Sequence, residues 1–273
     1  MIQLIFIDVD GTLVGTSGTV HPEVWAAAER AREQGVHLAI CSGRPAFGTT
    51  RDYAERLDPD GWHVFQNGAS AVHLPSGRSL SGRLASETVD VLVQRARRTG
   101  RVLELYADGE YAVESTAGRA RQHASLLGVP FAPRPFEALT GPVVRAQWLL
   151  TRDETPPVLA EPHPGLELSP STSPVMPETV FVNMTPTGVN KASAVRAVAA
   201  AYEVPLDCVM FVGDGHNDVA AMRAVGVPVA MANAEPEVHE VARYAVAHVD
   251  DIGLVEAITL ALTADESLLR SCG

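Results

Sequence analysis

Short apolar runs that end in acidic or small polar residues recur along this chain, and they constrain its fold more than any other feature. The first run, Leu4 to Ile7, leads directly into Asp8. Similar runs end at Ser42 and at Asp214, and stretches with the periodicity of amphipathic helices separate them. Continuous apolar strands that alternate with such helices are typical of a parallel sheet covered on both faces. We therefore predict an α/β fold.

The middle of the chain has a different pattern from the two outer segments. It predicts a helix and then a hairpin that turns at Asp108-Gly109, a strong hairpin signal. From 155 to 177 the chain is rich in proline, which favours loops and extended backbone over long helices. We predict a parallel-sheet core formed by residues 1–82 and 186–273, with an α+β domain inserted at 83–185.

The individual elements follow from the same periodicities. In the core we predict helices over 22–34, 49–57, 190–202, 218–225 and 252–262, and strands over 3–8, 36–41, 63–66, 208–212, 227–231 and 244–247. In the inserted domain we predict a helix over 86–99 and strands over 102–106, 110–113, 143–150 and 179–183.

The charge balance excludes some classes of partner. The 273-residue chain has a net charge of −12 at pH 7, which disfavours unassisted binding to nucleic acids or anionic membranes. We expect no secretory signal, because Met1 leads straight into the first predicted strand without a basic segment. The sequence contains no apolar run of the roughly 18 residues needed to cross a bilayer. The three cysteines, Cys41, Cys208 and Cys272, show neither metal-binding nor disulfide spacing. We expect a cytoplasmic protein, and its oligomeric state stays open.

Asp8 and Asp10 are the first candidate reactive residues. They follow a buried strand two positions apart, and burial of two unpaired charges is too costly unless a cation accompanies them. Ligands of open α/β sheets bind at this end of the strands, and carboxylate oxygens suit Mg²⁺. Asp8 would then attack a phosphoryl group, while Asp10 protonates the leaving oxygen and later activates water. The alternatives are an ordinary Asp-Gly turn or a calcium loop, but Thr19 stands where such a loop needs Glu.

Two further segments supply candidate phosphate ligands. Ser42, Gly43 and Arg44 follow the second apolar run, where a hydroxyl and backbone N–H groups can hold phosphate oxygens. Lys191 is the only lysine of the chain and follows Asn190, a predicted helix N-cap. A cation in the first turn opposes the helix dipole, which makes sense if both face one anion. A strand-to-helix turn and a surface lysine are the plain structural alternatives.

The last candidate segment is Gly213-Asp214-Gly215-His216-Asn217-Asp218, which ends the third apolar run. Asp214 would complete a Mg²⁺ site with Asp8 and a main-chain carbonyl, and Asp218 is a further candidate ligand. A capping turn without a ligand is the alternative. We expect His216 to point to solvent, because it stands alone beside hard oxygen ligands.

In order and content these segments resemble the four motifs of the haloacid dehalogenase-like hydrolases. The form of the last motif, together with Gln66-Asn67-Gly68-Ala69, is similar to the Cof-type branch of sugar-phosphate phosphatases. That resemblance implies a Rossmann-like core with a large C2-type cap inserted between the second and third motifs. It also implies metal binding and phosphate binding by two sets of residues: Asp8, Asp10, Asp214 and Asp218 for the metal, and Gly11, Ser42, Gly43, Arg44, Asn67, Lys191 and Asn217 for the phosphate. The third motif departs mildly, with Asn190 and Ala192 where the branch often has Ser and Gly.

The sequence therefore predicts a Mg²⁺-dependent phosphatase acting on a small phosphorylated metabolite, such as a sugar phosphate, through an aspartyl-phosphate on Asp8. Two alternatives stay open. One is a phosphomutase on the same scaffold, and the other is a non-catalytic protein that binds phosphorylated metabolites. In the inserted domain, Arg119, His123 and Arg145 are candidate substrate contacts, although each fits a surface or packing role equally well.

Overall fold

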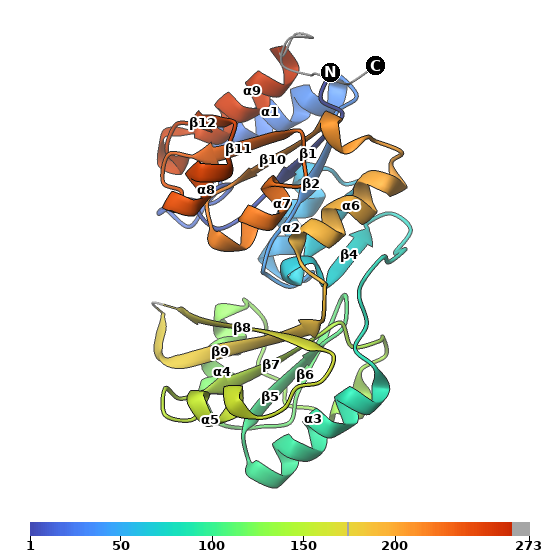
Figure 1. Ribbon diagram of the computed structural model, residues 1–273, viewed down its shortest axis with the longest axis vertical. Helices are drawn as coiled ribbons and strands as arrows, with labels where there is room; N and C mark the ends of the chain where they lie inside the picture. Colours follow the sequence, from blue (N-terminus) through green and yellow to red (C-terminus); the bar gives the residue numbers. More distant parts are fainter. Residues whose placement is uncertain (174, 264–273) are drawn as a thin grey trace. The chain divides into compact units, whose positions relative to one another are not determined.

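The computed structural model describes residues 1–173 and 175–263, and their contacts divide the chain into two compact units (Figure 1). The first unit comprises residues 1–44, 50–80 and the described chain from 190 onward. The second comprises residues 45–49 and 81–189. The chain therefore crosses between the units at four places.

A five-stranded parallel sheet forms the centre of the first unit, as the sequence predicts. Its strand order is β12-β11-β10-β1-β2, so that β1 lies between the strands that carry the second and fourth motifs. The strands are β1 (Leu4–Ile7), β2 (His37–Ile40), β10 (Val209–Gly213), β11 (Val227–Met231) and β12 (Tyr244–Val246). All four residues of β1 are buried, which explains why its sequence is a continuous apolar run.

Helices cover both faces of this sheet (Figure 1). On one face the apolar core joins the sheet to α6 (Lys191–Ala201), α7 (Val219–Met222) and α8 (Pro236–Val241). On the other face α1 (Pro22–Glu33) packs against α9 (Gly253–Thr263), while α2 (Thr49–Leu57) follows β2. The helix expected over 218–225 begins one residue later, after a 3₁₀ turn at His216–Asp218, and ends early, at Met222 with Arg223 as its C-cap. A short antiparallel pair, β3 (Trp62–Phe65) and β4 (Ser70–His73), completes the unit, and β4 is absent from the sequence prediction.

The second unit is built on a five-stranded antiparallel sheet of order β6-β5-β7-β9-β8. Its strands are β5 (Val102–Tyr106), β6 (Tyr111–Val113), β7 (Arg145–Leu150), β8 (Leu166–Ser173) and β9 (Met176–Pro186). Its helices are α3 (Ser86–Thr99), α4 (Gly118–Leu126) and α5 (Thr155–Ala160). The β5–β6 hairpin is confirmed. The proline-rich stretch contains β8 and the start of β9 beside the expected loops, since proline is tolerated in an edge strand such as β8 and at a strand end.

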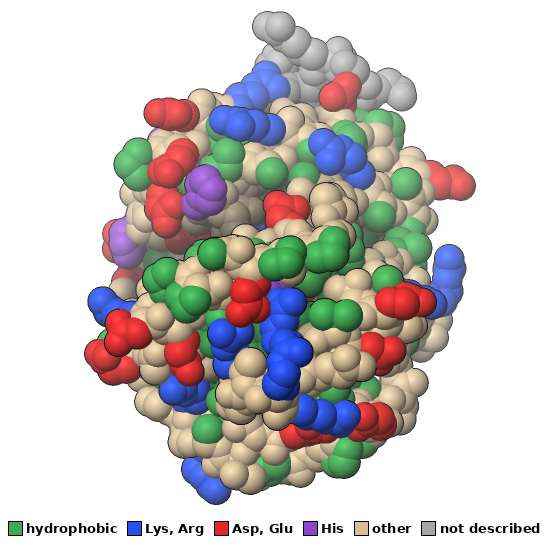
Figure 2. All heavy atoms as spheres, turned by 60° about the horizontal axis from the view of Figure 1, so that its bottom comes forward, with side chains coloured by type: hydrophobic (Ala, Val, Ile, Leu, Met, Phe, Trp, Pro, Cys, Tyr) green, Lys and Arg blue, Asp and Glu red, His purple; other side chains and the backbone are tan. Residues whose placement is uncertain are grey.

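Charged side chains of both signs lie close together on the face of the molecule that Figure 2 shows. In the second unit, for example, Arg97 pairs with Glu114 and Glu137, and Arg101 pairs with Glu161. Paired arginines of this kind do not form the uncompensated basic surface that nucleic acids require. Among the described residues, no helix has both the length and the apolar character needed to span a membrane.

Candidate functional site

Asp8, Lys191 and Asp218 form a buried ion triad at the carboxyl end of the central strands. The Lys191 ammonium donates to Oδ1 of Asp8 at 2.7 Å and to Oδ1 of Asp218 at 2.6 Å. The three residues are 6%, 1% and 0% exposed, respectively. Lys191 is the first residue of α6, and a capping box between Asn190 and Ser193 fixes that helix start. The structure thus brings together three residues that are far apart in the sequence.

Asp214 lies beside this triad and is held by the turn that follows β10. Its backbone N–H donates to Oδ2 of Asp218 at 3.1 Å, and its side chain accepts a hydrogen bond from Thr12 Oγ1 at 2.9 Å. Gly11 has a φ of +82°, and a Cβ at this position would collide with the Asp214 carboxylate. Glycine at position 11 therefore allows the two acidic turns to approach each other.

The electrostatics of the group call for a further cation. Oxygens of Asp8, Asp214 and Asp218 lie within 4.8 Å of one another, and Lys191 compensates only one of the three negative charges. Burial raises the pKa of Asp8 above its ordinary value, against the opposing effect of Lys191, and burial raises the pKa of Asp214 to about 6. Burial by itself would lower the pKa of Lys191, but the two carboxylates raise it, so the ammonium stays charged. Clustered carboxylate oxygens with excess negative charge fit a divalent cation such as Mg²⁺.

Asp10 is not one of the three carboxylates that cluster within 4.8 Å of one another. Arg44 holds it with a bidentate contact, in which Nε donates to Oδ2 at 2.9 Å and an NH2 group donates to Oδ1. The side chain of Asp10 is 63% exposed, so it is accessible to solvent. A cavity of about 400 Å³ opens beside this pair, and its lining also includes Thr16, Asn233 and His248. The structure thus places Asp10 as a separate acidic group at the edge of an open cavity.

The remaining predicted phosphate ligands meet at one place. The Asn67 backbone N–H donates to the Ser42 carbonyl at 2.9 Å, and the Asn217 side chain donates to Asn67 Oδ1 at 2.9 Å. Ser42 is fully buried, and its Oγ accepts from the Arg44 N–H at 3.1 Å. A Cβ on Gly43 would come within 3.1 Å of Asn67. The segments around the second motif, the Asn-Gly-Ala segment and the fourth motif therefore line one small region.

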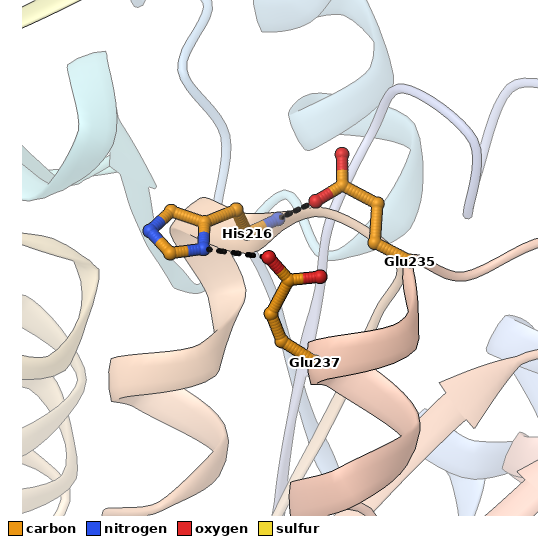
Figure 3. Close-up of side chains that lie close together, drawn as sticks. All are labelled: His216, Glu235 and Glu237. Carbon is orange, nitrogen blue, oxygen red and sulfur yellow. Dashed lines mark hydrogen bonds and ion pairs between the residues drawn. The ribbon is translucent and has the colours of Figure 1, made fainter.

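His216 points to solvent, as the sequence analysis expects, with a side chain that is 79% exposed. Figure 3 shows it beside Glu235 and Glu237 at the start of α8. The His216 backbone N–H donates to Glu235 at 3.1 Å, and Nδ1 lies 3.7 Å from Glu237. This exposed group is separate from the buried carboxylates.

Asn233 is a residue of the site that was not predicted from the sequence. Its Nδ2 donates to the Gly11 carbonyl at 2.8 Å, and its Oδ1 accepts from the Val249 N–H at 3.0 Å. It therefore ties the first acidic turn to the segment after β12. Asn233 stands two residues after β11, so the rule that identified Asp8, a polar residue just beyond an apolar parallel strand, would have identified it too.

The three candidate residues of the inserted domain all have partners within the second unit. Arg119 pairs with Glu154 at 2.7 Å, and His123 lies 2.8 Å from the buried Glu104. The Arg145 guanidinium lies over the Tyr106 ring, 4.0 Å from its centroid. These contacts are consistent with the packing role that was left open for each residue.

Comparison with known proteins agrees with this arrangement. The model of the haloacid dehalogenase-like hydrolases matches residues 5–258. A Bacillus subtilis protein, 5-amino-6-(5-phospho-D-ribitylamino)uracil phosphatase YcsE, is 27% identical over 243 residues, which are 89% of each chain. A solved haloacid dehalogenase-like hydrolase from Bacteroides thetaiotaomicron is 26% identical and superposes with a TM-score of 0.83, over 95% of this chain and 99% of that one.

The chain also has the same fold as a solved sugar phosphatase of haloacid dehalogenase subclass IIB. That structure is 23% identical, has a TM-score of 0.76, and covers 94% of this chain and 98% of its own. The family model spans both the parallel sheet and the inserted antiparallel sheet, and the buried Asp8–Lys191–Asp218 triad occupies the strand ends where the motifs were predicted. On this evidence the chain belongs to the haloacid dehalogenase-like hydrolase family.

Proposed function

We propose that this haloacid dehalogenase-like phosphatase hydrolyses phosphate monoesters of small metabolites by transferring the phosphoryl group to Asp8. The observation that carries the proposal is the buried Asp8 carboxylate, which Lys191 holds at a strand end beside Asp214 and Asp218. A carboxylate in such surroundings is a poor choice for stability alone, because its burial costs free energy. It is well placed, however, for attack on a phosphoryl group.

In the proposed reaction an oxygen of Asp8 forms a bond to phosphorus as the bond to the leaving oxygen breaks. Lys191 contacts Oδ1 of Asp8, which orients the carboxylate and places positive charge where the phosphoryl oxygens gather. The backbone around Gly11 and Ser42, with Asn67 and Asn217, would bind the phosphoryl oxygens. A bound Mg²⁺, held by Asp8, Asp214 and Asp218, would offset the negative charge of nucleophile and substrate.

Asp10 is assigned the proton transfers. It gives its proton to the leaving oxygen in the first half-reaction and takes a proton from water in the second, when water attacks phosphorus and releases Asp8 and phosphate. Its accessible position beside a cavity of about 400 Å³ leaves room for a leaving group. Arg44 holds both carboxylate oxygens of Asp10 and would orient them.

Sugar phosphates and phosphorylated sugar alcohols are the substrate class that we propose. Phosphatase YcsE, the B. subtilis relative, is named for a substrate with a phosphorylated ribityl chain. A phosphomutase uses the same motifs and differs only in where the phosphoryl group goes next. We place hydrolysis first because the relative is a phosphatase, and a cytoplasmic location stays a prediction from the sequence.

The test is release of inorganic phosphate from a panel of sugar, sugar-alcohol and nucleoside monophosphates and p-nitrophenyl phosphate, with Mg²⁺ or with EDTA. We expect release with Mg²⁺ and a loss of at least about 100-fold with EDTA, because three clustered carboxylates repel an anionic substrate when no cation is bound. Isomerised sugar phosphate without free phosphate would instead identify a mutase. Binding of substrate without either product would identify a non-catalytic protein.

Mg²⁺ binding is expected to strengthen as the pH rises from about 5 to about 8. In the metal-free protein burial raises the pKa of Asp214 to about 6 and raises that of Asp8 as well, so Mg²⁺ must displace protons at low pH. A carboxyl group whose pKa is raised in the folded protein favours folding at low pH, where the group is protonated. This contribution is lost as the pH rises through the raised pKa. The melting temperature of the metal-free protein should therefore fall from pH 5 to pH 8. The rise in melting temperature that added Mg²⁺ causes should become larger over the same range. Thermal unfolding at several pH values, with and without Mg²⁺, measures both; an increase that does not change with pH would contradict the prediction.

A further inference from the structure

Residues 45–49 belong to a different unit from the residues on either side of them in the chain. Arg44 and Thr50 belong to the first unit, whereas Pro45–Thr49 have their contacts in the second. We call these five residues the strap. Two crossings are enough to insert a domain, so the strap adds two that the insertion itself does not require.

Aromatic stacking fixes the strap in the second unit. The ring of Phe47 lies 6.4 Å from Tyr106 and 5.7 Å from Tyr111 between centroids, at interplanar angles of 6° and 20°. Stacked aromatic rings attract each other in addition to the apolar area that they bury. Gly48 adds a steric requirement, since its φ is +60° and a Cβ there would lie 2.9 Å from the Leu127 carbonyl oxygen.

The surface under Phe47 is held rigidly by buried polar contacts. The Tyr106 hydroxyl donates to Glu104 at 2.6 Å, and Glu104 is fully buried. His123 and Gln147 also contact this carboxylate, at 2.8 Å and 3.2 Å. A buried carboxylate with several partners has one favourable arrangement, so Tyr106 is an ordered support for Phe47.

The other end of the strap leads into the reactive site of the first unit. Arg44 is bonded directly to Pro45, its backbone N–H donates to Ser42 Oγ, and its carbonyl accepts from the Gln66 N–H at 2.9 Å. Its side chain holds both oxygens of Asp10. Because adjacent Cα atoms are only about 3.8 Å apart, a movement of the strap is passed on to Arg44.

We propose that Phe47 is a positioning residue for Asp10, acting through the strap and Arg44. The strap packs on residues of the second unit, so loss of this packing alters how Arg44 holds the proton-transferring carboxylate. The consequence for catalysis rests on the proposed function, whereas the mechanical coupling between Phe47 and Arg44 does not.

The test compares Phe47→Ala with Phe131→Ala, which removes another half-exposed ring of the second unit that is not joined to a motif. The value of kcat/KM is measured for p-nitrophenyl phosphate, whose leaving group needs no proton, and for the best alkyl phosphate of the panel, whose leaving group does. We expect Phe47→Ala to lower kcat/KM about tenfold for the alkyl ester and less than about twofold for the aryl ester. Asp10→Asn should show the same selectivity more strongly. Phe47→Tyr, which keeps the stacked ring, should remain close to wild type, and Phe131→Ala should affect both esters equally.

Amide hydrogen exchange tests the coupling without any turnover. In Phe47→Ala we expect faster exchange in the strap, at the Arg44 amide and in the turn from Val9 to Val14, and in Phe131→Ala no change at the last two places. Equal losses on both esters, or unchanged exchange at Arg44 and in that turn, would overturn the proposal. If wild type releases no phosphate from any ester, the proposed function fails, and the exchange result alone decides whether Phe47 is coupled to Arg44.

Discussion

Replacing Asp8 with asparagine is expected to abolish phosphate release while leaving the fold intact. The amide keeps the size of the carboxylate and an oxygen that can accept from Lys191, but it is not a competent nucleophile. Loss of a nucleophile typically lowers kcat by at least about 10⁴-fold. The variant should unfold at no lower a temperature than wild type without metal, because one of three repelling carboxylates has been removed.

Phosphate release and thermal unfolding measure the two effects, and the exposed Asp60→Asn provides a matched control that should leave both unchanged. Mass spectrometry of wild type quenched in acid during turnover should show one added phosphoryl group, which Asp8→Asn should lack. Turnover of this variant within about tenfold of wild type would contradict the nucleophile assignment.

Replacing Lys191 with methionine is expected to remove both activity and much of the stability. The ammonium is 1% exposed and is shared by two buried carboxylates, so its removal leaves uncompensated negative charge. Breaking a buried ion pair in this way typically costs about 3–5 kcal/mol of unfolding free energy. Methionine has a similar length and fills the same space, which separates the loss of charge from the loss of volume.

Urea unfolding at pH 7.5 measures this effect, and Mg²⁺ should recover part of the lost stability because it supplies positive charge to the same carboxylates. Lys191→Arg keeps the charge but brings a planar fork into a buried site shaped around one ammonium, so we expect it to rescue stability only in part. A variant Lys191→Met that unfolds at the same urea concentration as wild type would show that the triad contributes no net stability.

Local patterns were sufficient to predict most of the first unit. The inner strands β1, β10 and β11 of its parallel sheet are short, apolar and fully buried, so the local sequence pattern locates them. The sequence did not predict β4, which is short and pairs with β3, and it extended the helix after Asp218 to residue 225 although α7 ends at Met222. In the second unit the β5–β6 hairpin was predicted, whereas β8 was not. β8 contains proline, which argues against a strand in the sequence but is tolerated at the edge of a sheet.

The candidate site, too, could be predicted only in part. The residue types and their places after strands were enough to predict that Asp8, Asp214 and Asp218 meet at one place, because parallel strands bring their carboxyl ends to one edge. They were not enough to predict which side chains pair with which. Asp10 was predicted as a metal ligand together with Asp8, Asp214 and Asp218. Its side chain pairs with Arg44, whereas Asp8 clusters with Asp214 and Asp218.

From the amino-acid sequence one can predict the alternation of strand and helix, the insertion of a second domain and the polar residues that follow the strands. These depend on interactions between near neighbours and on strand ends, which local composition records. The fold in three dimensions was needed to see that Lys191 lies between Asp8 and Asp218, that Asn233 ties two turns together, and that Phe47 belongs to a different unit from Arg44. Each of these depends on contacts between residues far apart in the chain, and no local pattern specifies them.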